Sequence, residues 1–236
     1  MERGLVVSRA RARDLVLRGE VTVDGEVAGK PAMLVGSETL IVLAPGAGDY
    51  VSRGALKLAA GLDRFAIDVA GRIGLDIGAA QGGFTEVLLA RGASKVYAVD
   101  NGRDQLAEVL RGDPRVVSLE QTDARTLSRA QIVEPIGIIV ADVSFISLLK
   151  VLPAGLALAG AGAVLVALVK PQFETEPRHV GKDGVVRDAG VRDGAVAKVE
   201  AWIDAQPGWR RLGSLPSPIE GGSGNVEFLI GAVRDA

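Results

Sequence analysis

From about Ser52 onward, short apolar runs alternate with amphipathic segments along the chain. Uninterrupted runs rich in Val, Ile and Leu are typical of strands covered on both faces of a parallel sheet. We expect seven strands, at Arg72–Ile77, Lys95–Val99, Val116–Leu119, Ile138–Ala141, Ala163–Val169, Arg211–Leu215 and Val226–Ile230. We expect helices between them, at Gly83–Arg91, Arg103–Arg111, Ile146–Ala157 and Ala189–Ala205. This alternation predicts an α/β fold with a Rossmann-like, doubly wound, mostly parallel seven-stranded sheet.

One apolar segment is long enough to raise the question of a membrane span. Val151–Val169 holds 19 residues without a charge, which is close to the length that crosses a bilayer. Pro153 suits a helix start and Gly155 weakens a continuous helix, while Ala-Gly-Ala-Gly at 159–162 is typical of a turn. We therefore predict a short buried helix, a loop and the strand Ala163–Val169, and no membrane partner.

The first 45 residues have a different pattern. Ser8 is a favourable N-cap for a helix at Arg9–Arg18, and Gly19 suits its end. A hairpin follows around Asp24-Gly25, and Leu40–Leu43 predicts a further strand. We therefore predict a small α+β domain at 1–45, a linker at 46–51 and a larger domain at 52–236.

Charge separates the same two regions. The whole chain has 27 basic and 29 acidic residues, but residues 1–18 hold five arginines against two acids, a local charge of +3. These arginines are Arg3, Arg9, Arg11, Arg13 and Arg18. A positive surface favours phosphate backbones such as that of RNA. A solvated helix face is the simpler explanation of the run taken alone.

Composition excludes several kinds of chemistry. Without cysteine, the chain cannot form disulfides, thiolate metal sites or thiol nucleophiles. His179 is the one histidine, so a two-histidine metal site is excluded as well, and we expect no metal. Residues 1–12 lack the apolar core of a signal peptide, which predicts a cytoplasmic location. The sequence assigns no oligomeric state.

A glycine-containing loop follows the first strand of the larger domain. In Asp76–Phe84, the glycines allow backbone amides to approach a ligand at the start of a helix. Asp100 ends the next strand, where its carboxylate can accept both hydroxyls of a ribose, and Asp123 follows the third strand, where it can receive an adenine amino group. The spacing fits neither a dinucleotide fingerprint nor a phosphate loop. A nucleoside-type cofactor is favoured, although a tight strand-to-helix turn alone explains the glycines equally well.

Several motifs in this chain resemble known families. Asp76–Phe84 is similar to the cofactor loop of FtsJ-type RNA 2′-O-methyltransferases that use S-adenosylmethionine. Five blocks in order resemble the TlyA family, at Val51–Leu58, Asp142–Ser147, Leu168–Glu174, Val180–Asp188 and Ser217–Phe228. The arginine helix and its hairpin resemble the small S-four-type RNA-binding domain that precedes the methyltransferase domain in that family.

The resemblance implies a class I methyltransferase that acts on the ribose of ribosomal RNA, at cytidine. It also implies a catalytic tetrad of Lys57, Asp142, Lys170 and Glu227. We interpret Lys170 as the base or hydroxyl-orienting group, Asp142 as its aligning carboxylate, and the other two as positioning groups. The residues expected to bind S-adenosylmethionine are Asp76, Gly78, Ala79, Gly82, Phe84, Asp100, Asp123 and Asp142.

The chain departs from the family pattern at two places. Gln81 stands where related loops carry Pro, Ser or Thr, which affects loop rigidity rather than charge. The RNA-binding domain of the family usually begins with another helix, of which only an apparent end, Glu2–Leu5, is present here. We therefore expect a truncated RNA-binding domain.

Smaller features leave alternatives open. The loop Glu174–Asp188 either closes over substrate or is a plain solvated loop, and His179 within it is interpreted as incidental. Phe145, Phe173 and Phe228 adjoin the tetrad and can serve as stacking surfaces or as core. Two other functions compete with methyl transfer, a membrane-active haemolysin and an RNA-binding or assembly factor that lacks the reaction.

Overall fold

The computed structural model describes residues 3–6, 9–17, 19–44, 50–221 and 224–235. The chain forms two compact units, Met1–Arg53 and Gly54–Ala236. The predicted linker at 46–51 lies largely outside the described residues, as do Ser8 and Arg18.

The first unit is a helix with a three-stranded antiparallel sheet. Helix α1 (Arg9–Leu17) is followed by β1 (Val21–Val23), β2 (Glu26–Val27) and β3 (Ile41–Leu43) in the order β2-β1-β3. Asp24 and Gly25 both have positive φ, which is the geometry of the tight hairpin that the sequence predicts. Leu15 and Val21 are buried in its small core.

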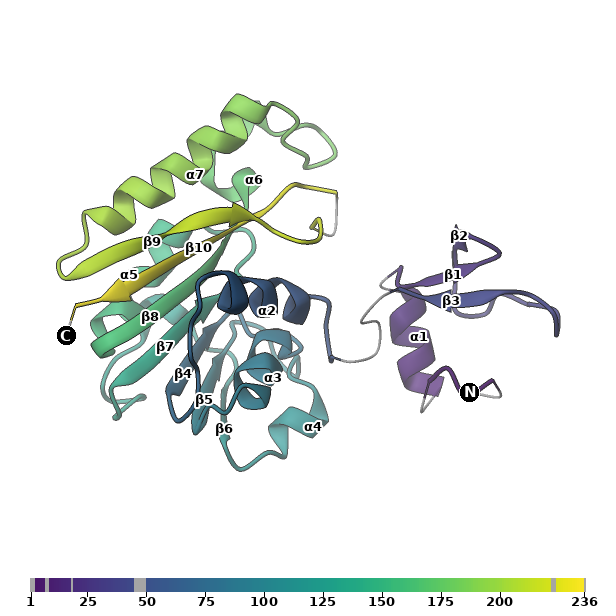
Figure 1. The fold of residues 1–236 in the computed structure, drawn as a ribbon, viewed down its shortest axis with the longest axis horizontal. Helices are drawn as coiled ribbons and strands as arrows, with labels where there is room; N and C mark the ends of the chain where they lie inside the picture. The colour runs from purple at the N-terminus through teal and green to yellow at the C-terminus, as the bar shows by residue number, and fades with distance from the viewer. Residues whose placement is uncertain (1–2, 7–8, 18, 45–49, 222–223, 236) are drawn as a thin grey trace. The chain divides into compact units, whose positions relative to one another are not determined.

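The second unit contains a seven-stranded sheet in the order β6-β5-β4-β7-β8-β10-β9 (Figure 1). The first five strands in this order are parallel, and β10 is antiparallel to both β8 and β9. The strands are β4 (Ile73–Ile77), β5 (Lys95–Val99), β6 (Val116–Leu119), β7 (Ile136–Ala141), β8 (Ala159–Val169), β9 (Trp209–Pro216) and β10 (Phe228–Arg234). This confirms the predicted doubly wound, mostly parallel sheet.

Helices cover both faces of this sheet. Helices α2 (Gly54–Arg64) and α3 (Gly83–Ala90) pack together on one face, where Gly61 faces Val166 and Leu229. Helices α5 (Leu148–Ala157) and α7 (Ala189–Asp204) pack on the other, over a core that includes Leu165 and Ala167. Neighbouring residues of β8 therefore face opposite layers, as expected for a strand covered on both sides. Short helices α4 (Glu108–Arg111) and α6 (Pro171–Glu174) and two 3₁₀ turns, η1 (Ala124–Thr126) and η2 (Pro177–His179), complete the unit.

Two predictions for the long apolar segment are wrong. Residues 159–162 are part of β8 rather than a turn, because Ala159 already pairs with Ile136. The register shifts after Ile136, and Gly162 has a φ of +66°, so an irregularity in the strand replaces the expected loop. Pro153 lies inside α5 rather than at its start.

The helix predicted at Arg103–Arg111 is reduced to its last four residues, α4. Glu120, which follows β6, accepts hydrogen bonds from the backbone N–H groups of Asp104, Gln105 and Leu106. These donors are therefore held by a side chain from another part of the chain, and Asp104 has a φ of +54°. A tertiary contact overrides the local helical pattern here.

Among the helices formed by the described residues, none combines the length and the apolar character that a membrane crossing requires.

Candidate active site

The glycine loop brings the ends of β4 and β7 together. Gly78 follows the last residue of β4 and has a φ of +83°, and a Cβ atom there would lie 2.5 Å from the carbonyl oxygen of Asp142. The backbone N–H of Asp142 in turn donates to the carbonyl of Ile77 at 3.0 Å. Glycine is therefore required at 78, because any side chain would separate the two strand ends.

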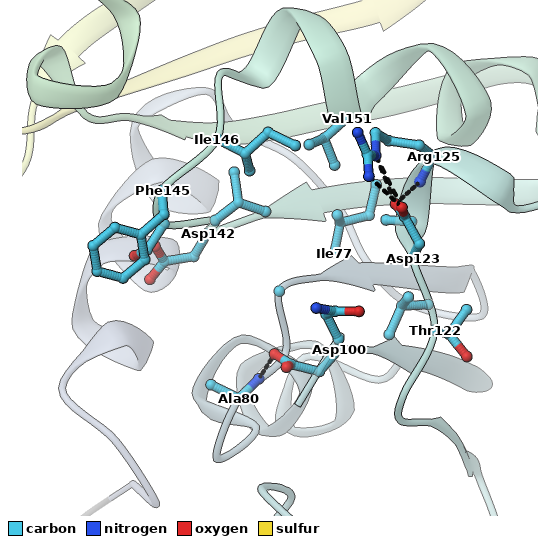
Figure 2. A pocket seen from close by; sticks show the side chains of 16 residues that line it. Ile77, Ala80, Asp100, Thr122, Asp123, Arg125, Asp142, Phe145, Ile146 and Val151 are labelled. Atoms are coloured by element: carbon cyan, nitrogen blue, oxygen red, sulfur yellow. Dashed lines mark hydrogen bonds and ion pairs between the residues drawn. The ribbon is translucent and has the colours of Figure 1, made fainter. Parts of the chain in front are cut away.

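A cavity of about 590 Å³ opens beside this loop, at the carboxyl ends of β4, β5 and β7 (Figure 2). It falls within the range of about 300 to 1,000 Å³ that is usual for small-molecule sites. Of the residues expected to bind a cofactor, four line it: Gly78, Asp100, Asp123 and Asp142. Asn101, Thr122, Arg125, Ser144, Phe145, Ile146 and Val151 also line it and were not predicted as cofactor residues.

Asp100 organises the part of the cavity wall next to the glycine loop. Its carboxylate accepts the backbone N–H of Ala80 at 2.8 Å and that of Gly102 at 2.6 Å. These two bonds fix the side chain at the end of β5 while leaving it on the cavity surface, as Figure 2 shows. A carboxylate held in this way has acceptor capacity left for a ribose hydroxyl.

Asp123 lines the cavity but is already engaged. Arg125 donates to both carboxylate oxygens through its guanidinium, at distances from 2.6 to 3.0 Å, and through its backbone N–H (Figure 2). These bonds lower the pKa of Asp123 to about 2. The predicted contact with an adenine amino group stays a prediction, and Arg125 would share the carboxylate with it.

The remaining predicted cofactor residues lie behind the cavity wall rather than on it. Ala79, Phe84 and Asp76 are buried, and Gly82 has a φ of +94° with the Leu110 side chain directly against it. Their burial fits residues that shape the loop, and their predicted contact with the cofactor stays a prediction.

Asp76 is the unusual member of this group, because its carboxyl group is fully buried and pairs with no cationic side chain among the described residues. The Thr85 hydroxyl donates to Oδ2 at 2.6 Å, whereas Oδ1 has no hydrogen-bond partner among the described residues. Burial raises the pKa of Asp76 to about 7, with a smaller contribution from the neighbouring Asp142.

The four residues of the expected tetrad form two lysine–carboxylate pairs. Lys57 lies in α2, with its Nζ 2.5 Å from an oxygen of Glu227, and the two side chains are 9% and 3% exposed. Lys170 follows β8, with its Nζ 2.6 Å from Oδ1 of Asp142, and these side chains are 12% and 22% exposed. The Lys170 ammonium also donates to the Ser144 hydroxyl at 3.0 Å.

Both pairs lie at the same edge of the sheet. Because β10 is antiparallel to β8 and Phe228 pairs with Val169, Glu227 precedes β10 where Lys170 follows β8. Lys57 is one helical turn before Gly61, which packs over these two strands. The structure therefore brings together the ends of β7 and β8, the start of β10 and the start of α2.

Comparison with known proteins agrees with this geometry. Residues 50–234 match the family of FtsJ-like methyltransferases, and residues 2–41 match the S4 domain. The chain belongs to the FtsJ-like methyltransferase family. The methyl donor of this family is S-adenosylmethionine, and the glycine cradle at Gly78 and the fixed carboxylate of Asp100 fit a nucleoside with a cationic sulfur.

Three relatives cover almost the whole chain. It is 49% identical to the 16S/23S rRNA (cytidine-2′-O)-methyltransferase TlyA of Mycobacterium tuberculosis, over 98% of this chain and 86% of that protein. It is 39% identical to Hemolysin A of Brachyspira hyodysenteriae, over 96% and 94%. A solved structure from Streptococcus thermophilus, named as a haemolysin, superimposes with a TM-score of 0.80 at 39% identity, over 99% and 86%.

Aromatic side chains in this methyltransferase divide between rim and core. Phe145 is 91% exposed, lines the cavity and has a φ of +64°, which is rare for a bulky residue. Its ring lies 5.2 Å from that of Phe173, centroid to centroid. Phe228 packs against the main core instead.

The loop Glu174–Asp188 is fastened to the approach of β10. The buried side chain of Asn225 accepts the backbone N–H of Val186 at 3.0 Å and donates to the carbonyl of Gly184 at 2.8 Å. His179 is exposed and accepts a hydrogen bond from Arg178. These contacts favour a fixed conformation of the loop Glu174–Asp188 over one that closes on substrate.

The predicted RNA-binding arginines differ in their availability. Arg3 donates to the carbonyls of Gly36, Ser37 and Thr39, so it holds a loop of its own unit. Arg9 and Arg13 are exposed on α1, whereas the side chain of Arg11 and the whole of Arg18 lie outside the described residues. In the part of the chain that the structure describes, no cluster of acidic and histidine side chains could hold a metal ion.

Proposed function

We propose that this chain transfers a methyl group from S-adenosylmethionine to the 2′-hydroxyl of a cytidine in ribosomal RNA. The observation that carries the proposal is the Lys170–Asp142 pair, because Asp142 lines the glycine-lined cavity together with Asp100. The relatives named as cytidine-2′-O-methyltransferases support the choice of substrate. We propose the cytoplasm, where ribosomes are modified, as its location.

In this mechanism, the cavity residues bind the methyl donor, and Lys170 accepts the proton of the 2′-hydroxyl. When bound, S-adenosylmethionine supplies a methyl group on a positively charged sulfur. Lys170, once it has given up its own proton and is a neutral amine, orients the 2′-hydroxyl and takes its proton as the new carbon–oxygen bond forms and the carbon–sulfur bond breaks. Asp142, 2.6 Å from the lysine Nζ, stabilises the resulting ammonium group.

The remaining groups position substrate. The buried pair of Lys57 and Glu227 fixes the start of β10 beside Lys170. Phe145, exposed on the rim, offers a face on which a base can stack. Arg9 and Arg13 of the S4-like unit are proposed to contact RNA phosphates.

The test is transfer of tritiated methyl groups from S-adenosylmethionine to purified ribosomal subunits, followed by mapping of ribose methylation. The proposal predicts incorporation at a cytidine 2′-oxygen by the natural protein and its loss in Lys170→Met. Lys150→Met, which changes an exposed lysine of α5, is the matched control and retains activity.

Two other results would favour the alternatives. RNA binding without methyl incorporation would identify an RNA-binding factor. Leakage from liposomes on addition of the purified protein would revive the membrane-active function that the relative named Hemolysin A suggests.

A further inference from the structure

The carboxylate of Glu174 is buried close to the site but has no part in the proton transfer described above. It is 3% exposed and lies at the end of α6, four residues after Lys170. It accepts the Ser147 hydroxyl at 2.6 Å and the backbone N–H of Leu148 at 2.7 Å. Its backbone carbonyl accepts the ammonium of Lys198, from α7, at 2.8 Å.

These contacts join two segments that both begin at the catalytic edge of the sheet. One runs from Asp142, directly after β7, to Ser147, the N-cap of α5. The other runs from Lys170, directly after β8, to Glu174. The Lys170–Asp142 pair connects the two segments where they leave the sheet, and Glu174 connects them at their far ends.

The segment that Glu174 secures contains a strained residue. Phe145 has a φ of +64°, and its ring contacts Phe173, the neighbour of Glu174 in the chain. A bulky residue keeps such a backbone conformation only where the surrounding structure holds both sides of it. Asp142 is held by β4 through the backbone bond to Ile77, and Ser147 and Leu148 are held by Glu174.

Burial of this carboxylate is unfavourable in itself. Burial raises the pKa of Glu174, against the effect of its hydrogen bonds to Ser147 and Leu148. A neutral side chain at the N-terminus of α5 would avoid that cost, since Ser147 already caps the helix by accepting the N–H of Leu149. The carboxylate therefore does more than cap a helix.

We propose that Glu174 is a positioning residue for methyl transfer, which sets the Asp142 segment against the Lys170 segment so that the lysine Nζ points at the reacting hydroxyl. This inference rests on the proposed function. Glu174 does not contact the cofactor cavity, so its loss should affect the rate of the chemical step and leave the affinity for S-adenosylmethionine unchanged.

The test compares three variants in single-turnover methyl transfer to ribosomal subunits and in S-adenosylmethionine binding by calorimetry. Glu174→Ala should lower the rate by about 100-fold, the cost of a misplacement of about 1 Å, with cofactor affinity kept. Glu174→Gln should recover most of this loss, because its amide oxygen accepts the Leu148 N–H and its amide N–H donates to the Ser147 oxygen. Glu176→Ala, which removes an exposed carboxylate paired with Arg178 in the next turn, is the control and keeps the natural rate.

A second variant, Glu174→Asp, is used if Glu174→Ala does not fold. Glu174→Asp keeps the charge but cannot span both donors, so its rate should also fall with cofactor affinity kept. A natural rate in folded Glu174→Ala or Glu174→Asp would overturn the proposal. Equal losses of rate and of cofactor affinity in the folded variants would overturn it too.

A second readout does not depend on catalysis. The ¹³Cε resonance of Lys170, assigned by its absence in Lys170→Met, should move in Glu174→Ala and stay in place in Glu176→Ala. An unmoved resonance would contradict the positioning role. If the natural protein methylates no ribosomal RNA, the proposed function fails, and this resonance still decides whether Glu174 positions Lys170.

Discussion

The two lysine–carboxylate pairs of the site have the same chemistry and different surroundings. The side chains of Lys57 and Glu227 are 9% and 3% exposed and those of Lys170 and Asp142 are 12% and 22% exposed, so the pairs differ mainly at Asp142, which lines the cavity. A buried pair fixes the elements that carry it, since separating the charges is costly there. A pair whose carboxylate lines a cavity lies where a bound substrate can come close to it. The comparison assigns geometry to the first pair and proton transfer to the second.

The largest effect on stability is expected for Lys57→Met, which leaves the Glu227 carboxylate buried without a partner. The free energy of unfolding should fall by about 3 to 5 kcal/mol, measured by urea denaturation. Lys170→Met leaves Asp142 without its partner but on the cavity wall, where water can hydrate the carboxylate, so it should cost less. Adding Glu227→Leu to Lys57→Met should restore most of the stability without restoring activity. Equal losses for the two single variants would remove the distinction between the pairs.

Asp76 is a buried carboxyl group that forms no ion pair with the described residues. Because burial raises its folded pKa from 3.8 to about 7, the folded state favours the protonated form. Its contribution to stability is therefore complete at low pH and is lost as the pH rises from about 4 to about 7. The loss is at most about 4 kcal/mol, at about 1.36 kcal/mol for each pKa unit.

Asp76→Asn removes this titration, because an amide stays neutral throughout. The difference in unfolding free energy between Asp76→Asn and the natural protein should therefore shift in favour of the variant between pH 5 and pH 8. Urea denaturation at the two pH values measures it. A difference that does not change with pH would contradict a raised pKa at Asp76.

A smaller effect is expected from Gly221→Ala. A Cβ atom at 221 would lie 2.3 Å from Oε1 of Glu227, so the carboxylate must move and its contact with Lys57 must lengthen. We expect a stability loss of about 1 to 3 kcal/mol and a rate about 10-fold lower, because Glu227 no longer fixes the start of β10.

Gly194→Ala is the matched control for that substitution. Gly194 lies inside α7 with open space around its Cβ position, so alanine there should stabilise the protein by about 1 kcal/mol. A Gly221→Ala variant that behaves like Gly194→Ala would show that the buried pair tolerates displacement.

The smallest effect is expected for Ser144→Ala, which removes the hydroxyl that accepts from Lys170 at 3.0 Å. Asp142 still holds the lysine, so the single-turnover rate should fall only about threefold, the value of one modest hydrogen bond, with cofactor affinity unchanged. Ser94→Ala is the control, because Ser94 directly precedes β5 and so lies at the edge of the sheet opposite the site. A rate lowered as far as in Lys170→Met would mean that Ser144, rather than Asp142, orients the lysine.

Hydrophobic pattern alone predicted most of the fold. Strands Lys95–Val99 and Val116–Leu119 were placed to the residue; the first is a run buried on both faces, a pattern with little other explanation, and the second is a half-buried edge strand. The errors have physical causes at particular residues. The start of β8 depends on pairing between Ala159 and Ile136, and the shortened α4 depends on Glu120, which is remote in sequence. Such contacts leave no local signal.

The sequence motifs predicted which residues form the candidate site, but they did not predict most of the contacts between those residues. The motifs indicated all four tetrad residues and placed Asp142 with Lys170, but the enclosed partnership of Lys57 and Glu227 arises from the packing of α2 over β8 and β10. The exposed ring of Phe145 and the engagement of Asp123 by Arg125 also depend on tertiary geometry. Their catalytic and binding roles stay predictions.

The most direct test of the account is single-turnover methyl transfer by Lys170→Met, with S-adenosylmethionine affinity measured on the same sample. If the Lys170–Asp142 pair moves the proton, the rate falls by at least about 100-fold, the usual contribution of a general base, and cofactor affinity stays within about twofold of natural. Methylation at the natural rate by a fully folded, cofactor-binding Lys170→Met would contradict the assignment of the chemistry to this pair.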